Sequence, residues 1–156
     1  MELADLIVSA VIFEGDAPSS KEGVVEQLLL KLAEDGHISP ADVPALLAEA
    51  MRRESLGSTG IGQGVAIPHA KNAAVPRLLG ILGLFRPPVN FDSIDGEPAD
   101  IIALLLAPRD PPGIDRRRAS NVSKKLLRLF CDGEFRGRIR RARSAVEITE
   151  LLKVSG

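Results

Sequence analysis

Two histidines are the side chains of this 156-residue chain whose chemistry depends most on their setting. His69 follows Pro68 at the end of a glycine-laced segment, whereas His37 follows Gly36 between two predicted helices. An imidazole with an ordinary pKa of ~6.5 keeps a neutral nitrogen lone pair at cellular pH, so it can accept a phosphoryl group. A histidine near a helix C-terminus, as expected for His37, has an ordinary electrostatic explanation. His69 is therefore the candidate nucleophile, although a lone histidine in this setting is equally consistent with a core residue.

The residues upstream of His69 are suited to phosphoryl transfer. That reaction needs positioning and hydrogen-bond donors around the moving negative charge. Ser58 and Thr59 offer hydroxyls, Gly60 offers a backbone N–H, and Arg53 adds a fork of charged donors. These four residues are predicted to support a phosphoryl group on His69.

Other classes of site fail on spacing. Gly64 is followed by Val65 and Ala66 rather than by the Lys and Ser or Thr of a nucleotide-hydrolase phosphate loop. The third glycine comes one residue too early for a dinucleotide fingerprint, and no serine has the flanking glycines of a nucleophile elbow. One cysteine and two widely separated histidines make no metal-ligand cluster. We expect neither a metal nor a cofactor.

The composition narrows the class of partner. With 20 basic and 21 acidic side chains the net charge is only -1, and Trp and Tyr are absent, which argues against nucleic acid as a ligand. No apolar run approaches the ~18 residues of a membrane span, so no direct membrane insertion is expected. Cys131 has no internal disulfide partner, and no signal peptide is recognisable. We expect a single cytoplasmic domain over residues 1–156.

Helices are predicted in the sequence both before and after the candidate site. A capping box at Ser19–Glu22 begins a helix that Gly36 ends, and Pro40 begins a second helix that reaches about Arg53 or Ser55, with Pro44 as a possible bend. Two further helices are predicted, from about Arg118 to Phe130 and from the capping box that begins at Ser144.

Three segments read as strands. In residues 60–67 apolar side chains alternate with Gly and Ala, which predicts one extended strand that ends at Pro68 and has a nearly bare face. The runs 78–85 and 101–107 are apolar on both alternations, as in strands covered by helices on both faces. Between these two runs the turn formers Arg86-Pro87-Pro88 and Asp95–Pro98 predict a loop or short edge structure, and residues 110–113 predict another loop.

The run from Arg53 to His69 closely resembles the signature of fructose/mannitol-type enzyme IIA domains of the bacterial phosphotransferase system. Residues 89–100, with the strand that follows them, are similar to a second block of the nitrogen-regulatory members. The likeness spans about Ala4 to Leu152. It implies an α/β fold with a mixed, roughly five-stranded sheet and helices on both faces.

The resemblance also implies roles and partners. In that family the histidine matching His69 takes a phosphoryl group from the phosphocarrier protein HPr or its nitrogen-branch counterpart. Transport members then pass the group to an enzyme IIB. The arginine matching Arg53 helps to hold the phosphate, and Ser58 and Thr59 match a pair of supporting hydroxyls.

One departure from the family concerns a second histidine that usually lies near the first. Residues 116–121 read Arg-Arg-Arg-Ala-Ser-Asn, and the missing histidine falls near Ala119. Its absence puts the transfer kinetics or the ordinary partner in doubt. Ser120 or Asn121 is a hypothetical replacement as a hydrogen-bonding group.

Two basic stretches, Arg116–Arg118 and 136–143, have two interpretations. They are solvated helix faces, or they dock an acidic partner. If the family geometry holds, Arg116–Arg118 lie near His69 and offset the ~-2 charge of a phosphoryl group.

Three functions are compatible with the sequence. The first is a phosphotransferase that relays a phosphoryl group through His69 to a IIB-type protein. The second is a non-transferring regulatory module whose docking to a transporter or sensor kinase depends on the phosphorylation of His69; the absence of attached IIB and IIC domains favours it. The third is a binding domain that keeps the fold without the phosphorylation.

Overall fold

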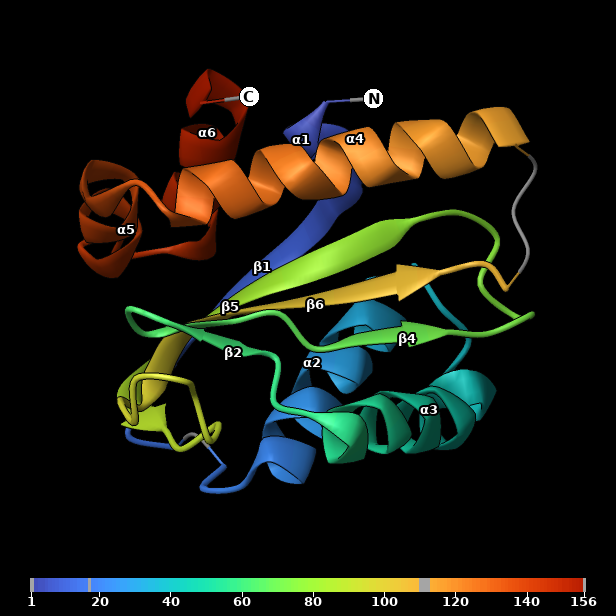
Figure 1. Ribbon diagram of the computed structural model, residues 1–156, viewed down its shortest axis with the longest axis horizontal. Helices are drawn as coiled ribbons and strands as arrows, with labels where there is room; N and C mark the ends of the chain where they lie inside the picture. Colours follow the sequence, from blue (N-terminus) through green and yellow to red (C-terminus); the bar gives the residue numbers. More distant parts are fainter. Residues whose placement is uncertain (1, 17, 110–112, 156) are drawn as a thin grey trace.

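The computed structural model describes residues 2–16, 18–109 and 113–155, leaving aside the side chains of residues 113–116 and 119. It is an α/β structure with a mixed sheet, as predicted (Figure 1). In chain order its elements are α1 (Leu3–Leu6), β1 (Ile7–Glu14), α2 (Lys21–Glu34), η1 (Pro40–Asp42), α3 (Val43–Leu56), β2 (Gly60–Gly62), β3 (Val65–Ala66), β4 (His69–Lys71), β5 (Leu79–Val89), β6 (Ala99–Ala107), α4 (Gly113–Phe130), α5 (Gly133–Arg140) and α6 (Ala145–Ser155).

The sheet runs in the order β1-β5-β6-β3-β2, and β4 also pairs with β6. β1 is parallel to β5, β5 is antiparallel to β6, and both β3 and β4 are parallel to β6. β3 and β4 therefore lie one after the other along the same edge of β6. This arrangement places His69, the first residue of β4, opposite Leu105 near the C-terminal end of β6.

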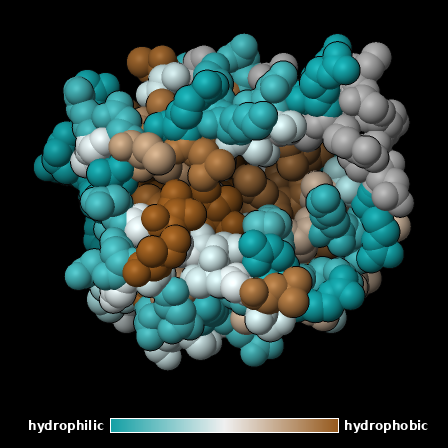
Figure 2. All heavy atoms as spheres, in the orientation of Figure 1, coloured by the Kyte–Doolittle hydropathy of each residue, from teal (hydrophilic) through white to brown (hydrophobic). Residues whose placement is uncertain are grey.

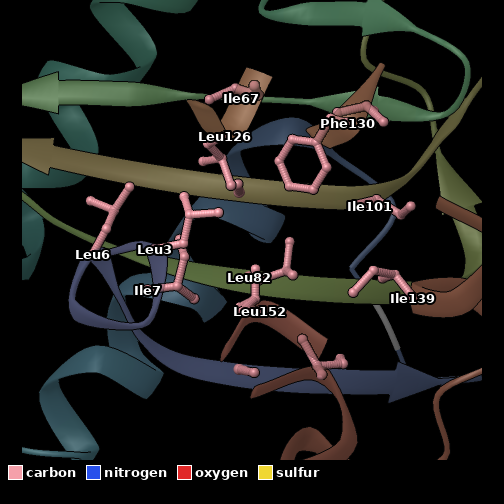
Figure 3. Packing of buried hydrophobic residues seen from close by; sticks show 14 of the residues in the cluster. Leu3, Leu6, Ile7, Ile67, Leu82, Ile101, Leu126, Phe130, Ile139 and Leu152 are labelled. Carbon is pink, nitrogen blue, oxygen red and sulfur yellow. The ribbon is translucent and has the colours of Figure 1, made fainter. Parts of the chain in front are cut away.

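Helices cover both faces of the sheet, which confirms the predicted layers. In Figure 1, α1, α4, α5 and α6 lie on one face, and α2 and α3 lie on the other. Figure 3 shows how Leu3, Leu126, Phe130 and Ile139 pack from the first group of helices onto strand residues such as Leu82. A second buried cluster fills the space beneath α2 and α3.

The two strands predicted to be buried on both faces are the centre of the sheet. β5 and β6 are almost entirely buried from Leu79 to Phe85 and from Ile101 to Leu106. In the stretch predicted to be a loop or short edge structure, β5 continues through Arg86-Pro87-Pro88 to Val89, and residues 90–98 form a loop. The ladder between β5 and β6 is interrupted between Leu84 and Val89, so the two prolines occupy a stretch where no partner on β6 needs their missing N–H groups.

The two helices predicted in the N-terminal half are confirmed, except that the second is divided into two elements. Ser20 caps α2 by accepting a hydrogen bond from the Gly23 N–H at 3.1 Å, and Gly36 follows the helix with φ +81°. The second predicted helix is divided: η1 begins at Pro40, and α3 begins at Val43. Pro44 therefore lies in the first turn of α3, where no intrahelical N–H bond is lost.

The glycine-laced segment is not the single strand that its alternation predicts. β2 turns back antiparallel onto β3, with positive φ angles at Gly62, Gln63 and Gly64. Such a turn needs left-handed backbone at successive residues, which glycines adopt without strain. The predicted end at Pro68 is also displaced, because β3 ends at Ala66, and a separate strand, β4, begins at His69.

Several elements were not predicted. α1, β1 and α5 have no counterpart among the expected segments, and α4 begins at Gly113 rather than at about Arg118. The arginine run at the start of α4 carries no apolar periodicity, so only its C-terminal part was recognisable. Most of the loop predicted at residues 110–113 lies outside the described residues. No helix in the described part of the chain is long and apolar enough to cross a membrane.

Candidate functional site

A cleft of about 730 Å³ opens between α4 and the edge of the sheet that carries β2 and β4, and His69 lines it. Four buried side chains, Ile67, Leu78, Leu105 and Leu126, form its apolar inner wall. Figure 2 shows this hollow as a hydrophobic area in the middle of the face, bordered by hydrophilic residues. His69 is only half-buried, so its ring is not sealed inside the core.

One hydrogen bond orients the imidazole of His69. Its Nδ1 lies 3.0 Å from the carbonyl oxygen of Ile67. A carbonyl can only accept, so Nδ1 carries the hydrogen and donates it. In the described part of the chain Nε2 has no hydrogen-bond partner. In the neutral ring, Nε2 therefore holds the free lone pair, and this nitrogen is available for bond formation.

Arg53 lies in the last turn of α3 and lines the same cleft as His69. Its Nη1 donates to the carbonyl oxygen of Gly57 at 2.9 Å, which holds the guanidinium against the loop that leaves the helix. A guanidinium has five N–H donors, so most of them remain for an anion. The structure thus brings together the two residues that the sequence singled out as nucleophile and charged donor.

Ser58 and Thr59 also line the cleft, but their hydroxyl protons are already used. Ser58 Oγ donates to the carbonyl oxygen of Phe91 and accepts from the Gly60 N–H at 3.0 Å. Thr59 Oγ1 donates to the carboxylate of Glu54. A hydroxyl has one proton to donate, so in this arrangement both side chains shape the loop rather than offer donors to a phosphoryl group.

Gly60 is required by close packing. A Cβ atom at this position would lie 2.2 Å from Ser93 Oγ, closer than any real contact. Ser93 is buried, and its hydroxyl is the one buried side-chain polar atom of the described residues with no hydrogen-bond partner. The loop before the site therefore approaches residues 91–93 too closely for any larger side chain.

Glu54 is the main residue of the site that the sequence did not reveal. Its Oε2 accepts from Lys21 Nζ at 3.1 Å and from the Thr59 N–H at 3.0 Å, while Oε1 accepts from the Thr59 hydroxyl. Lys21 also reaches Asp92 at 3.0 Å. Burial by itself would lower the pKa of Lys21, but hydrogen bonds to Asp92 and Glu54 outweigh it and raise that pKa above 10.5. These contacts fix the loop that carries Thr59 between α2 and α3.

The hairpin between β2 and β3 is held from two sides. Arg140 Nε and Nη2 bind the carboxylate of Asp100 at 2.8 and 3.0 Å, and Nη2 also donates to the Gln63 carbonyl oxygen at 2.6 Å. On the other side, Asp95 accepts from the Gln63 N–H at 2.9 Å. This bond, with a second from the Glu97 N–H, lowers the pKa of Asp95 below 3.8.

The wall that α4 contributes differs in part from expectation. Ser120 and Ser123 line the cleft, whereas Asn121 does not. Arg117 and Arg118 are exposed and do not line the cleft. The side chains of Arg116 and Ala119, which the sequence prediction also concerned, lie outside the described residues. Of the two candidates to replace a second histidine, the structure places only Ser120 at the cleft.

His37 lies between α2 and η1 and does not line the cleft, so it takes no part in the site. Within the described residues, no group of three or more His, Cys, Asp or Glu side chains is placed to hold a metal ion. The groups that line the cleft and could act on a ligand are the imidazole of His69, the cations Arg53, Lys71 and Arg109, and the hydroxyls of Ser120 and Ser123 on α4.

The sequence matches, over residues 6–155, the family described as "Phosphoenolpyruvate-dependent sugar phosphotransferase system, EIIA 2". The chain belongs to this family. The resemblance stated from the Arg53–His69 run is thereby confirmed, and the EIIA 2 fold agrees with the sheet and the helix layers described above.

Similar proteins are of two kinds. A nitrogen regulatory protein of Bradyrhizobium diazoefficiens is 32% identical over 152 residues, which cover 97% of this chain and 95% of that protein. The 2-O-alpha-mannosyl-D-glycerate-specific EIIABC component of Escherichia coli is 32% identical over 139 residues, and the match covers 88% of this chain but only 20% of that much longer protein. Similarity to nitrogen-regulatory members of the EIIA 2 family, expected from residues 89–100, is confirmed.

Solved structures agree. The nitrogen regulatory protein IIA-Ntr of Neisseria meningitidis superposes with a TM-score of 0.72 at 33% identity, covering 96% of this chain and 94% of that one. The mannitol enzyme IIA of Escherichia coli, solved in complex with phosphorylated enzyme IIB, superposes with a TM-score of 0.69 at 21% identity, covering 92% of this chain and 94% of that one. The second likeness supports the EIIA 2 fold alone.

Proposed function

We propose that this protein is a phosphohistidine carrier of the cytoplasm, a protein phosphotransferase that accepts a phosphoryl group on Nε2 of His69. The main support for this proposal is the hydrogen bonding of the two ring nitrogens of His69. Nδ1 is tied to the Ile67 carbonyl at 3.0 Å, and Nε2 is left free on a half-buried ring that shares a cleft with Arg53. Membership of the EIIA 2 family supports the same role.

The proposed step exchanges one phosphorus–nitrogen bond for another. The lone pair of His69 Nε2 attacks the phosphorus atom of a phosphohistidine on an HPr-type carrier, in line with the bond that breaks. The donor ring, protonated on its other nitrogen, leaves as neutral imidazole with the electron pair of that bond, and the His69 ring takes over the positive charge. Nδ1 of His69 keeps its hydrogen bond to Ile67, so the ring is held in place throughout. No cofactor or metal enters this balance.

Arg53 stabilises the charge that spreads over the phosphoryl oxygens. Its remaining N–H groups are fixed near the cleft by the bond to Gly57, so they need little reorganisation during the reaction. Ser58, Thr59 and Gly60 act behind Arg53 by fixing the loop between α3 and β2. A IIB-type protein then removes the phosphoryl group from His69; the solved complex of the mannitol enzyme IIA with its phosphorylated IIB partner supports this direction by analogy of fold.

Radiolabelled phosphoenolpyruvate, enzyme I and an HPr-type carrier test this function directly. Wild-type protein should gain one acid-labile, base-stable phosphoryl group, detected by mass spectrometry, and His69→Gln should gain none. His37→Gln is the matched control, because it removes the other histidine without touching the cleft, and it should be labelled like the wild type. Equal labelling of His69→Gln and wild type would refute the assignment to His69.

A second candidate is a regulatory module in which phosphorylation of His69 changes docking to a transporter or sensor kinase, without onward transfer. Similarity to nitrogen regulatory proteins over nearly their whole length favours it. Addition of candidate IIB proteins to the labelled protein separates the two functions. Loss of label to a IIB protein supports the relay, and full retention supports the regulatory module.

A further inference from the structure

The positive charge of this chain is concentrated on the helices next to the cleft. Residues 116–143, which form most of α4 and all of α5, contain eleven of the 20 basic residues but only two of the 21 acidic ones. The near-neutral total therefore hides a strongly basic side and a strongly acidic remainder. Such an asymmetry produces a local field that net charge does not reveal.

Part of this charge is used inside the protein. Arg140 binds Asp100, Arg138 pairs with Glu134 at 2.6 Å, and Arg136 donates to the Phe130 carbonyl oxygen at 2.7 Å. Lys125 pairs with Glu2 at 3.6 Å. These residues have structural explanations, and an interaction surface has to be sought among the others.

Three exposed cations on α4, Arg117, Lys124 and Arg128, form what we name the basic stripe. None of them has a hydrogen bond or an ion pair with any residue that the structure describes. At 100° of rotation per residue, the three lie within about 40° of one another around the helix axis and extend over about 16 Å of its length. The stripe is therefore one continuous, unneutralised face.

The basic stripe borders the cleft. Ser120 and Leu127, which line the cleft, lie about 40–100° around the same helix from the stripe residues. In Figure 2 hydrophilic residues cover α4 directly above the apolar hollow. On the opposite side the cleft is lined by the cations Lys71 and Arg109, and no Asp or Glu lines it within the described residues. A protein that docks over His69 thus meets positive charge on both sides.

We propose that the basic stripe of α4 docks an acidic face on the HPr-type carrier that donates a phosphoryl group to His69. This inference rests on the proposed function and adds the charge of the partner. The partner's phosphohistidine contributes a charge of ~-2, and Asp or Glu side chains around it would complement Arg117, Lys124 and Arg128. An RNA partner is less well matched, because the chain has no Trp or Tyr and four of its five Phe side chains, 85, 91, 130 and 135, are buried.

Rates of phosphorylation test the proposal. The substrate is the full chain, and the donor is the phosphorylated HPr-type carrier encoded by the same genome. We expect kcat/KM to fall by ~10-fold or more as the ionic strength rises from ~0.02 to ~0.5 M, because salt screens steering between exposed charges. At low ionic strength Lys124→Glu/Arg128→Glu should lower kcat/KM by ~10-fold or more, mainly through KM.

The matched control is Arg141→Glu/Lys153→Glu, which changes the net charge equally at exposed positions outside α4 and the cleft. At low ionic strength its kcat/KM for phosphorylation by the carrier should fall by less than ~3-fold. A carrier in which acidic residues around the phosphohistidine are replaced by Lys should recover activity with the Lys124→Glu/Arg128→Glu protein. Phosphoramidate is a small donor without a docking face, so its rate of reaction measures the reactivity of His69 alone. The Lys124→Glu/Arg128→Glu protein should react with phosphoramidate like the wild type and lose activity only with the protein donor.

Three results would overturn the inference. The first is a kcat/KM that stays constant or rises with salt. The second is an equal loss in the stripe variant and the control. The third is a stripe variant that loses binding to RNA or to anionic phospholipid vesicles but exchanges phosphoryl groups normally. Absence of phosphorylation by both the carrier and phosphoramidate would instead refute the proposed function, and this inference with it.

Discussion

Replacing Glu54 by Gln removes one negative charge from the interior while keeping the size of the side chain. The carboxylate is 4% exposed and accepts three hydrogen bonds, from Lys21 Nζ and from the N–H and hydroxyl of Thr59. A glutamine amide has one accepting oxygen and one NH₂ group, so the NH₂ would face a donor. The variant therefore leaves at least one buried donor unpaired.

The cost follows from this geometry. Breaking a buried ion pair by removing one partner costs ~3–5 kcal/mol. Lys21 is 18% exposed and keeps its contact with Asp92 at 3.0 Å, so the lower end applies. We expect the free energy of unfolding to fall by about 3 kcal/mol. The loop with Thr59 then moves relative to Arg53 and His69. A shift of about 1 Å in the position of reacting groups lowers the rate of phosphoryl transfer by up to ~100-fold.

Urea unfolding measures the first effect, and phosphorylation by phosphoramidate measures the second. Glu150→Gln is the control, because it removes the acid of a Glu–Lys pair of 3.4 Å on the surface of α6, where the loss should stay below about 0.5 kcal/mol. A loss of less than about 1 kcal/mol for Glu54→Gln, or one equal to that of the control, would show that the buried contacts do not hold the site.

Three further predictions concern α4, the hairpin and the loop before it. Ser120→Ala should slow phosphorylation of His69 about fivefold, the equivalent of one lost hydrogen bond of ~1 kcal/mol, while Asn121→Ala stays within about twofold; equal rates would exclude a role for Ser120. Because the pKa of Asp95 is lowered in the folded state, its stabilising effect is present above about pH 4 and is lost as the pH falls through the folded pKa; Asp95→Asn should therefore flatten the dependence of the unfolding free energy on pH below 4, and an unchanged dependence would contradict this. Gly60→Ala should destabilise the protein by about 1–3 kcal/mol because its Cβ meets Ser93 Oγ, and adding Ser93→Ala should recover part of the loss in urea unfolding; a fully stable Gly60→Ala protein would show that this packing is not tight.

The sequence predicted those parts of the fold that depend on interactions between residues close together in the chain. The cap at Ser20 and the Ser144 hydroxyl that accepts from the Glu147 N–H at 3.2 Å are short-range interactions, and they occur as expected. β5 and β6 were recognisable because both of their faces are apolar. The hairpin at Gly62–Gly64 was missed because its alternation is also that of a single strand, and only the two glycines that flank Gln63 indicated a reversal.

The site was predictable in its chemistry but not in its supports. His69 and Arg53 stand out by residue type, and both line the cleft. Glu54 was missed because its partner Lys21 is 33 residues away in the sequence. One signal was present: Glu54 continues the buried stripe of α3 formed by Val43, Leu46 and Ala50. A carboxylate on an apolar face needs a partner, and its occurrence there indicates a buried contact.

The most direct measurement for the central claim is the NMR spectrum of the imidazole nitrogens in ¹⁵N-labelled protein before and after phosphorylation by its carrier. The chain has only two histidines, so each ring can be assigned with the His37→Gln variant. We predict that the Nε2 resonance of His69 changes to that of a phosphorylated nitrogen, that Nδ1 keeps its proton, and that His37 is unaffected. Phosphorylation of Nδ1 of His69, or of His37, would contradict the account.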